Sequence, residues 1–210
     1  TPLAAFIGAL ITFFITMALA EASGGRPVSY ILSGIIIGIA ISSFTTILIV
    51  FSEDNRLHGA MFWLFGSFAY MSWTKALLII IPVLILCSII LLYARELNVI
   101  LLGDENARNL GLNVKVFKRI SVLVVSVLTA VSVAFCGIIA FLGLIIPHTA
   151  RMIVGGDHRL LIPTSMVMGP IVLLAADIFA RIIIRPVELP IGAIISLVGA
   201  PFFIYLMIRR

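Results

Sequence analysis

The residues with the clearest chemical potential are the few ionisable side chains that interrupt long apolar runs. Asp177 is the one acid deep inside such a run, and Arg181 follows it four residues later. In a helix this spacing places both on one face, where a carboxylate and a guanidinium can neutralise each other. An acid in an apolar segment can instead relay protons. We favour the structural pair, because Arg181 is in position to compensate the charge of Asp177.

Histidine and aspartate, which are common metal ligands, occur at two other places in the sequence. His148 follows Pro147 near the end of an apolar run, while Asp157 and His158 lie in a polar turn. A metal site requires more convergent ligands than either place offers. We therefore predict no metal site and no cofactor bound by this chain.

Nucleotide-binding and hydrolase motifs are absent from the sequence. There is no G-x-x-x-x-G-K-[ST] loop, no G-x-S-x-G turn and no H-E-x-x-H helix. The lack of a clustered nucleophile, base or ligand set argues against an intramembrane enzyme. If the protein uses ATP, the nucleotide and its Mg²⁺ must bind to another chain.

The composition is that of an integral membrane protein. Hydrophobic residues make up 62% of the 210 positions and charged residues 11%, with a mean hydropathy of +1.28. Soluble domains have roughly 45–50% and 25%, so this chain has too few polar residues to cover a water-facing surface. The formal charge of +5 arises from 14 Lys and Arg residues scattered between apolar runs, which does not resemble a nucleic-acid-binding surface.

The apolar runs predict an all-α, polytopic helix bundle in the membrane. A spanning helix needs about 20 apolar residues, and seven runs fit this requirement. They cover residues 2–20, 30–51, 76–94, 120–136, 137–154, 160–184 and 191–208. An aromatic-rich stretch at 59–73 predicts a short helix at the membrane interface, where amphipathic rings are enriched.

The most polar segment, residues 95–119, is too charged to lie in lipid. Within it, the stretch from Gly103 to Gly111 predicts a short helix, with two acids in the first turn and a glycine as the stop. Residues 112–118 predict a second short helix. From composition, the segment is either a docking surface for a soluble partner or a solvated connector, and both interpretations stay open.

The basic residues predict the orientation of the chain in the membrane. When the loops are assigned alternately to the two sides, ten of the 14 Lys and Arg residues fall on the side of the 95–119 loop and the C-terminus. Cytoplasmic loops carry the excess of Lys and Arg. We therefore expect the 95–119 loop and the C-terminus to be cytoplasmic, and Thr1 to lie outside.

The second predicted span has a face of small residues. Gly34 and Gly38 are four residues apart, and Ser42 and Thr45 continue the series. Small side chains allow close contact between helices. This face therefore packs against another helix or lines a transport pathway, and from the residues alone we favour packing.

Five ordered motifs follow one another along the chain: GDENARNLGLNV at 103–114, GIIAFLGLIIPHTAR at 137–151, GDHR at 156–159, ADIFAR at 176–181, and ELPIG with GAPFF between 188 and 203. Together they resemble the motifs of FecCD-type permeases, the membrane subunits of ATP-driven importers for ferric siderophores, haem and vitamin B12. Weaker similarity continues through 62–67 and 32–38, so that the resemblance covers effectively the whole chain.

The resemblance implies a single permease domain at 1–210, with 95–119 as its cytoplasmic coupling loop. Members of the family have about ten spans, so the chain resembles the C-terminal two-thirds of the family domain, and three N-terminal spans are expected to be missing. The expected partners are a second permease copy in a homodimer, two cytoplasmic ATPase subunits that carry ATP and Mg²⁺, an extracytoplasmic substrate-binding protein and the lipid bilayer. Nucleic acid is not an expected partner.

The implied function is that of a transporter subunit, not an enzyme, in a bacterial or archaeal cytoplasmic membrane. The cargo would be a ferric siderophore, haem or a cobalamin-like metal chelate, although oxyanion importers can share these motifs. The alternative is a secondary transporter or channel without an ATPase partner. That class needs membrane-embedded ionisable groups or broken helices to use an ion gradient, and Asp177 alone gives it thin support.

The resemblance also assigns site residues. The expected ATPase-coupling residues are Gly103, Asp104, Glu105, Ala107, Arg108, Leu110 and Gly111. The expected pathway and gate residues are Gly34, Gly38, Ser42, Thr45, Trp63 and Gly66. Asp177 and Arg181 remain a structural pair within a span.

Overall fold

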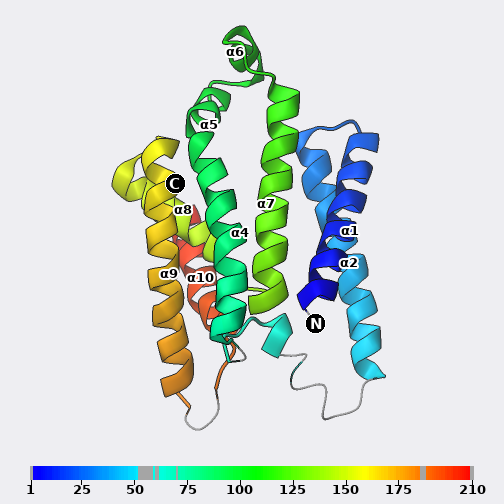
Figure 1. The fold of residues 1–210 in the computed structure, drawn as a ribbon, viewed down its shortest axis with the longest axis vertical. Helices are drawn as coiled ribbons and strands as arrows, with labels where there is room; N and C mark the ends of the chain where they lie inside the picture. The colour runs from blue at the N-terminus through cyan, green and yellow to red at the C-terminus, as the bar shows by residue number, and fades with distance from the viewer. Residues whose placement is uncertain (1, 52–58, 60–61, 70, 185–187, 209–210) are drawn as a thin grey trace. The chain divides into compact units, whose positions relative to one another are not determined.

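The computed structural model describes residues 2–51, 59, 62–69, 71–184 and 188–208, and the described part of the chain is helical with irregular connections (Figure 1). The all-α prediction is confirmed. Contacts divide the chain into two compact units, residues 1–62 and residues 63–210.

The first unit is a pair of packed helices, α1 (Pro2–Ala22) and α2 (Pro27–Val50). Pro27 stands at the start of α2, where its fixed φ favours a helix and its missing N–H costs no hydrogen bond. The two helices meet at Ala20 and Ser33, which are almost completely buried. Most other side chains of this unit are exposed, as expected for helices that are surrounded by lipid.

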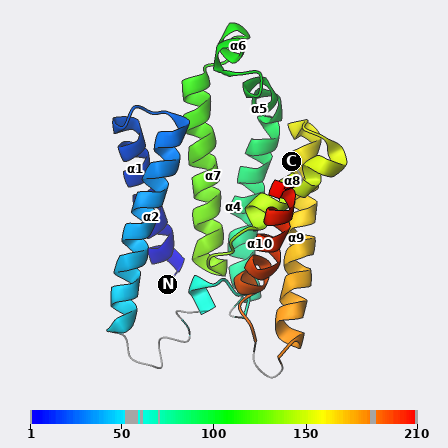
Figure 2. The ribbon, with the colours of Figure 1, turned by 180° about the vertical axis from the view of Figure 1, so that it is seen from behind.

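The second unit contains the remaining helices (Figures 1 and 2). Their bounds are α4 (Trp73–Leu92), α5 (Ala94–Ile100), α6 (Asp104–Asn109), α7 (Val114–Cys136), α8 (Leu142–Val154), α9 (His158–Ile182) and α10 (Ile191–Ile208). The α4 and α7 helices pack along each other, and α9 packs against α8, α10 and α5. The α6 helix stands at one end of this unit, and the C-terminal end of α9 lies at the other.

The seven predicted spans are present as apolar helices of two lengths. Within the described residues, α1, α2, α4, α7 and α9 are long and apolar enough to cross a bilayer, and α8 and α10 are shorter. Large apolar side chains are exposed along all seven helices, and α4 has no buried residue among those described. This distribution is inverted relative to a water-soluble bundle and fits side chains that contact lipid.

Two local predictions are corrected. The interfacial helix predicted at 59–73 is shorter in the structure, because among its described residues the helix ends at Leu64 and residues 65–69, 71 and 72 are irregular. The expected second short helix at 112–118 is instead the start of α7, which begins at Val114 with the Asn113 side chain accepting a hydrogen bond from the Val116 N–H at 3.3 Å. The extra helix of this loop is α5, which precedes α6.

The irregular stretch after Leu64 is held in a backbone junction, formed by residues 63–67, 136–139 and 191–192. The Ser67 N–H donates to the Cys136 carbonyl at 3.0 Å, the Ile138 N–H to Trp63 at 3.3 Å, and the Ile191 N–H to Gly66 at 3.0 Å. Backbone groups outside helices need such partners where water is excluded. The junction therefore explains how non-helical chain is accommodated between apolar helices.

The core of the second unit lies beside this junction. Ala176 and Ala180 of α9 face Ile191 and Ile195 of α10, and Phe68 packs against this cluster. Alanine at the contact lets two helix backbones approach closely. The small residues of the ADIFAR motif thus serve helix packing, which fixes α9 against α10.

Candidate functional site

The strongest candidate site is the protruding loop that carries α6. Its C-terminal end is closed by two backbone hydrogen bonds, from the Leu112 N–H to the Ala107 carbonyl at 3.0 Å and from the Gly111 N–H to Arg108 at 2.9 Å. This is a Schellman motif, and Gly111 has the positive φ of 86° that the motif requires. A six-residue helix is too short to be stable by itself, so such end-capping explains how α6 is held.

Two side chains tie α6 to the rest of the loop. Asp104 lies 2.6 Å from the ammonium group of Lys118, on the first turns of α7. The Asn106 amide donates to the Leu102 carbonyl at 2.8 Å. Ala107, in the middle of α6, is completely buried. Of the predicted coupling residues, Asp104 and Ala107 therefore face the loop itself.

Four exposed residues form what we call the outer surface of α6: the predicted coupling residues Glu105, Arg108 and Leu110, together with Asn109, which was not predicted. The other two predicted coupling residues, Gly103 and Gly111, flank α6 as its N-cap and its C-terminal stop. Leu110 exposes 65% of its surface, and the neighbouring Leu101 and Leu102 expose 62% and 58%. Exposed leucines beside an arginine at the end of a polar loop have the composition of a protein-docking surface. The geometry therefore favours docking over a merely solvated connector.

A second polar cluster joins α5 to the start of α9. The Asn98 amide donates to the Asp157 carboxylate at 2.6 Å, and its oxygen accepts from the His158 backbone N–H at 2.9 Å. The pKa of Asp157 is lowered, first by the Arg159 backbone N–H and then by Asn98, because both donate to the ionised carboxylate. Asp157 is consequently ionised at neutral pH.

Asp177 and Arg181 lie at the other end of α9. The Asp177 carboxylate is 3.0 Å from Nε of Arg181, and Nη1 of Arg181 is 3.5 Å from the Glu188 carboxylate. One guanidinium thus faces two carboxylates, which suits its fork of donors. This geometry is that of a local charge cluster at the end of a helix.

The predicted pathway and gate residues fall into two separate groups. Gly34, Gly38, Ser42 and Thr45 belong to α2 in the first unit, while Trp63 and Gly66 belong to the junction in the second. A Cβ atom at Gly34 or Gly38 would meet no atom within 4 Å. The glycines therefore do not serve the packing of α1 against α2, and this face of α2 is open at Gly34 and Gly38.

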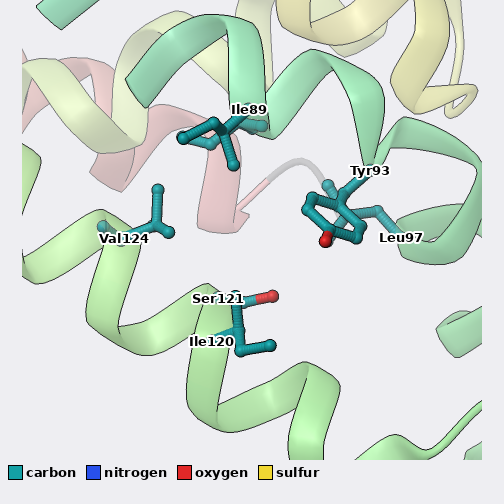
Figure 3. A pocket seen from close by; sticks show the side chains of 8 residues that line it. Ile89, Tyr93, Leu97, Ile120, Ser121 and Val124 are labelled. Carbon is teal, nitrogen blue, oxygen red and sulfur yellow. The ribbon is translucent and has the colours of Figure 1, made fainter. Parts of the chain in front are cut away.

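An apolar pocket of about 70 Å³ lies between α4 and α7 (Figure 3). It is lined mainly by aliphatic side chains, with the Tyr93 ring and the Ser121 hydroxyl at one end. The Tyr93 ring also packs edge-on against Phe117, with 5.8 Å between the ring centroids. Such a lining brings no nucleophile and general base together, so it offers no catalytic site.

The structure also reveals three residues that the sequence did not single out for these roles. Lys118 holds α6, Asn98 joins α5 to α9, and Glu188 adds a second carboxylate to Arg181. Among the described residues no three His, Cys, Asp or Glu side chains are arranged to hold a metal ion. Asn98 and Asp157 are 59 residues apart, so no local sequence pattern predicts their contact.

Comparison with known proteins gives a consistent match. The family model described as the FecCD transport family matches residues 1–209. The chain is 42% identical over 208 residues to the cobalamin import system permease protein BtuC of Halobacterium salinarum, covering 99% of this chain. It is 37% identical over 206 residues to the hemin transport system permease protein HmuU of Yersinia pestis, covering 98% of this chain. It spans 56% and 62% of the length of these two relatives.

A solved structure has a similar fold. It is that of a metal-chelate type ABC transporter in an inward-facing conformation, with a TM-score of 0.85 and 32% sequence identity. The match covers 100% of this chain and 74% of that chain. The likeness in fold therefore extends over both units of the present chain.

Proposed function

The chain belongs to the FecCD transport family, and from this premise we propose that it is the transmembrane permease part of an ATP-binding-cassette importer for metal chelates. Its relatives are permease subunits of such importers and not enzymes. The cargo we propose is a ferric siderophore, haem or a cobalamin-like chelate, since named relatives import hemin and cobalamin. ATP and Mg²⁺ would bind to a separate ATPase.

The observation that carries this proposal is the α6 loop. A helix held by Gly111 and by the ion pair between Asp104 and Lys118 presents Arg108 and Leu110 outward. A preformed, capped helix can transmit the closure of an ATPase as a rigid-body movement. We assign the outer surface of α6 to contact with the ATPase, and Asp104 and Ala107 to holding the helix in place.

The orientation follows from the same assignment. A cytoplasmic ATPase requires α6 on the cytoplasmic side, which agrees with the ten basic residues on the side of the 95–119 loop. The junction and the cluster of Asp177, Arg181 and Glu188 would then face outward. We further propose two permease copies, two ATPase subunits and an extracytoplasmic binding protein in the assembly, with the open face of α2, Trp63 and Gly66 along the pathway.

The charge cluster on α9 supports ATP-driven transport over coupling to an ion gradient. A proton relay needs a carboxylate that is free to change its charge. Asp177 is hydrogen-bonded to Arg181, and Glu188 lies within 3.5 Å of the same guanidinium. Both acids thus have an adjacent positive charge, which favours the structural role.

Uptake by the complete transporter in liposomes tests this function. We expect accumulation of a ferric siderophore, haem or cobalamin in the presence of the binding protein, ATPase and ATP. We expect no accumulation when a non-hydrolysable ATP analogue replaces ATP. Uptake that follows a proton or sodium gradient and ignores ATP hydrolysis would reject the importer and support a secondary transporter.

A charge swap tests whether Asp104 positions α6. We expect Asp104→Lys to weaken ATPase co-purification several-fold, because it places two cations together at the base of the helix. The double variant Asp104→Lys with Lys118→Asp restores the ion pair, and we expect it to recover binding. The pair is exposed and contributes only about 0.2–1 kcal/mol to stability, so both variants should remain folded. A double variant that binds as weakly as the single one would show that Asp104 contacts the ATPase directly.

A further inference from the structure

We propose that Asn98 is a positioning residue that joins α5 and the start of α9 into one rigid body, so that a movement of the α6 loop is passed to the transmembrane core. This inference rests on the proposed function, because it concerns how the docking loop acts. Its evidence is a cluster of hydrogen bonds between residues about 60 positions apart in the sequence.

The Asn98 side chain uses both ends of its amide. Its nitrogen donates to Oδ1 of Asp157 at 2.6 Å, and its oxygen lies 2.9 Å from the backbone nitrogen and 2.7 Å from Nδ1 of His158. A carboxylate can only accept and a backbone N–H can only donate, which fixes the orientation of the amide. The amide oxygen must then accept from Nδ1 of His158, so this nitrogen carries a proton.

The cluster holds the backbone of α9 and not only the tip of a side chain. Asp157 caps α9, because its Oδ1 also accepts from the Arg159 backbone N–H at 2.9 Å. The His158 N–H is one of the unpaired donors of the first turn, and it is satisfied by Asn98. A shift of α5 relative to α9 would therefore break the bonds of Asn98 to Asp157 and to the His158 N–H, while the cap from Asp157 to Arg159 lies within the start of α9 itself.

The position of Asn98 connects the docking loop to the core. Only residues 101–103 separate α5 from α6. The Gly103 N–H donates to the Ile100 carbonyl at the end of α5, and the Gly103 carbonyl accepts from the Ala107 N–H of α6. At its far end, α9 packs through Ala176 and Ala180 against α10. Apolar contacts between α5 and α9 can slide, whereas directional hydrogen bonds set their relative position.

A reciprocal swap tests the link in the complete transporter. Asn98→Asp places a carboxylate against Asp157, and we expect about a tenfold lower ratio of substrate transported to ATP hydrolysed, with ATPase co-purification unchanged. Adding Asp157→Asn restores an amide and a carboxylate in exchanged positions, and asparagine also caps helices well. We expect the double variant to recover the ratio to within about twofold.

The outcomes separate this inference from the proposed function. Loss of ATP-dependent uptake in the unsubstituted transporter would remove the function itself. An unchanged ratio in Asn98→Asp, with ATP-dependent uptake intact, would overturn only the role of Asn98. A low ratio in the double variant would also overturn it, because a restored link would then not restore coupling.

A distance measurement keeps the inference testable if Asn98→Asp does not fold. Spin labels at the exposed positions Arg95 and Leu160, in a background with Cys87 and Cys136 replaced by alanine, report the separation of α5 and α9. We expect the same narrow distance with and without trapped ATP, while the distance between the Leu160 labels of two permease copies changes. A change between Arg95 and Leu160 would show that α5 and α9 do not move together.

Discussion

Replacing Arg108 with glutamate is expected to weaken strongly the binding of the proposed ATPase to this chain. Arg108 is exposed on the outer surface of α6, next to Leu110, which exposes 65% of its surface. Arginine is enriched among residues that dominate protein interfaces, where a substitution costs about 2 kcal/mol or more. That loss weakens binding roughly 30-fold. Co-purification of the tagged permease with its ATPase, quantified against membrane-inserted protein, measures the effect.

The control for Arg108→Glu is a charge change at the opposite end of the same unit. Thr74 is exposed in the first turn of α4, where an added acid is favourable to the helix. We expect Thr74→Glu to insert and to bind the ATPase like the unsubstituted protein. Undiminished ATPase binding by Arg108→Glu would remove the outer surface of α6 from the interface, even if the family assignment stands.

The second large effect is expected at Gly137, which ends α7 at the backbone junction. Gly137 has φ of 74° and ψ of −169°, a conformation that is essentially restricted to glycine and costs other residues about 1–3 kcal/mol. A Cβ atom there would also overlap the Trp63 carbonyl oxygen and lie 3.0 Å from Cα of Gly66. These neighbours are backbone atoms, so a rotamer change cannot relieve the overlap. Overpacking adds about 1–3 kcal/mol.

Gly155 supplies a matched control for Gly137. It ends α8 with nearly the same backbone conformation, φ of 83° and ψ of −165°, but a Cβ atom there would meet nothing within 4 Å. We therefore expect Gly155→Ala to lower the free energy of unfolding only by the cost of the backbone conformation. Gly137→Ala should lower it by about 1–3 kcal/mol more, because its Cβ atom also overlaps the backbone of residues 63 and 66. Unfolding of both purified variants in the same detergent measures the difference. An equal decrease in the free energy of unfolding of the two variants would show that the backbone of the junction shifts to accommodate the added methyl group.

The sequence predicts the elements of α6 because their signals are local. Two acids in the first turn, Arg108 near the end and Gly111 as the stop lie within one short stretch, and the structure has the helix at Asp104–Asn109. The spacing of Asp177 and Arg181 likewise places them on one helical face. Hydropathy alone locates the apolar helices, because lipid selects for long apolar runs whatever their neighbours are.

Contacts between distant segments are decided by the tertiary structure. The aromatic residues predict a helix that continues past Leu64, but the backbone groups of Gly66 and Ser67 pair with Ile191 and Cys136, whose approach no local pattern encodes. The same holds for Asn98 with Asp157, and for the attachment of Asp104 to Lys118. For this protein, the sequence by itself determined the membrane class, the apolar helices and the short helix α6. Only the packing decided which side chains hold that helix and which face outward, because each set contains both a charged and an apolar residue and the two sets are interleaved along the same short helix.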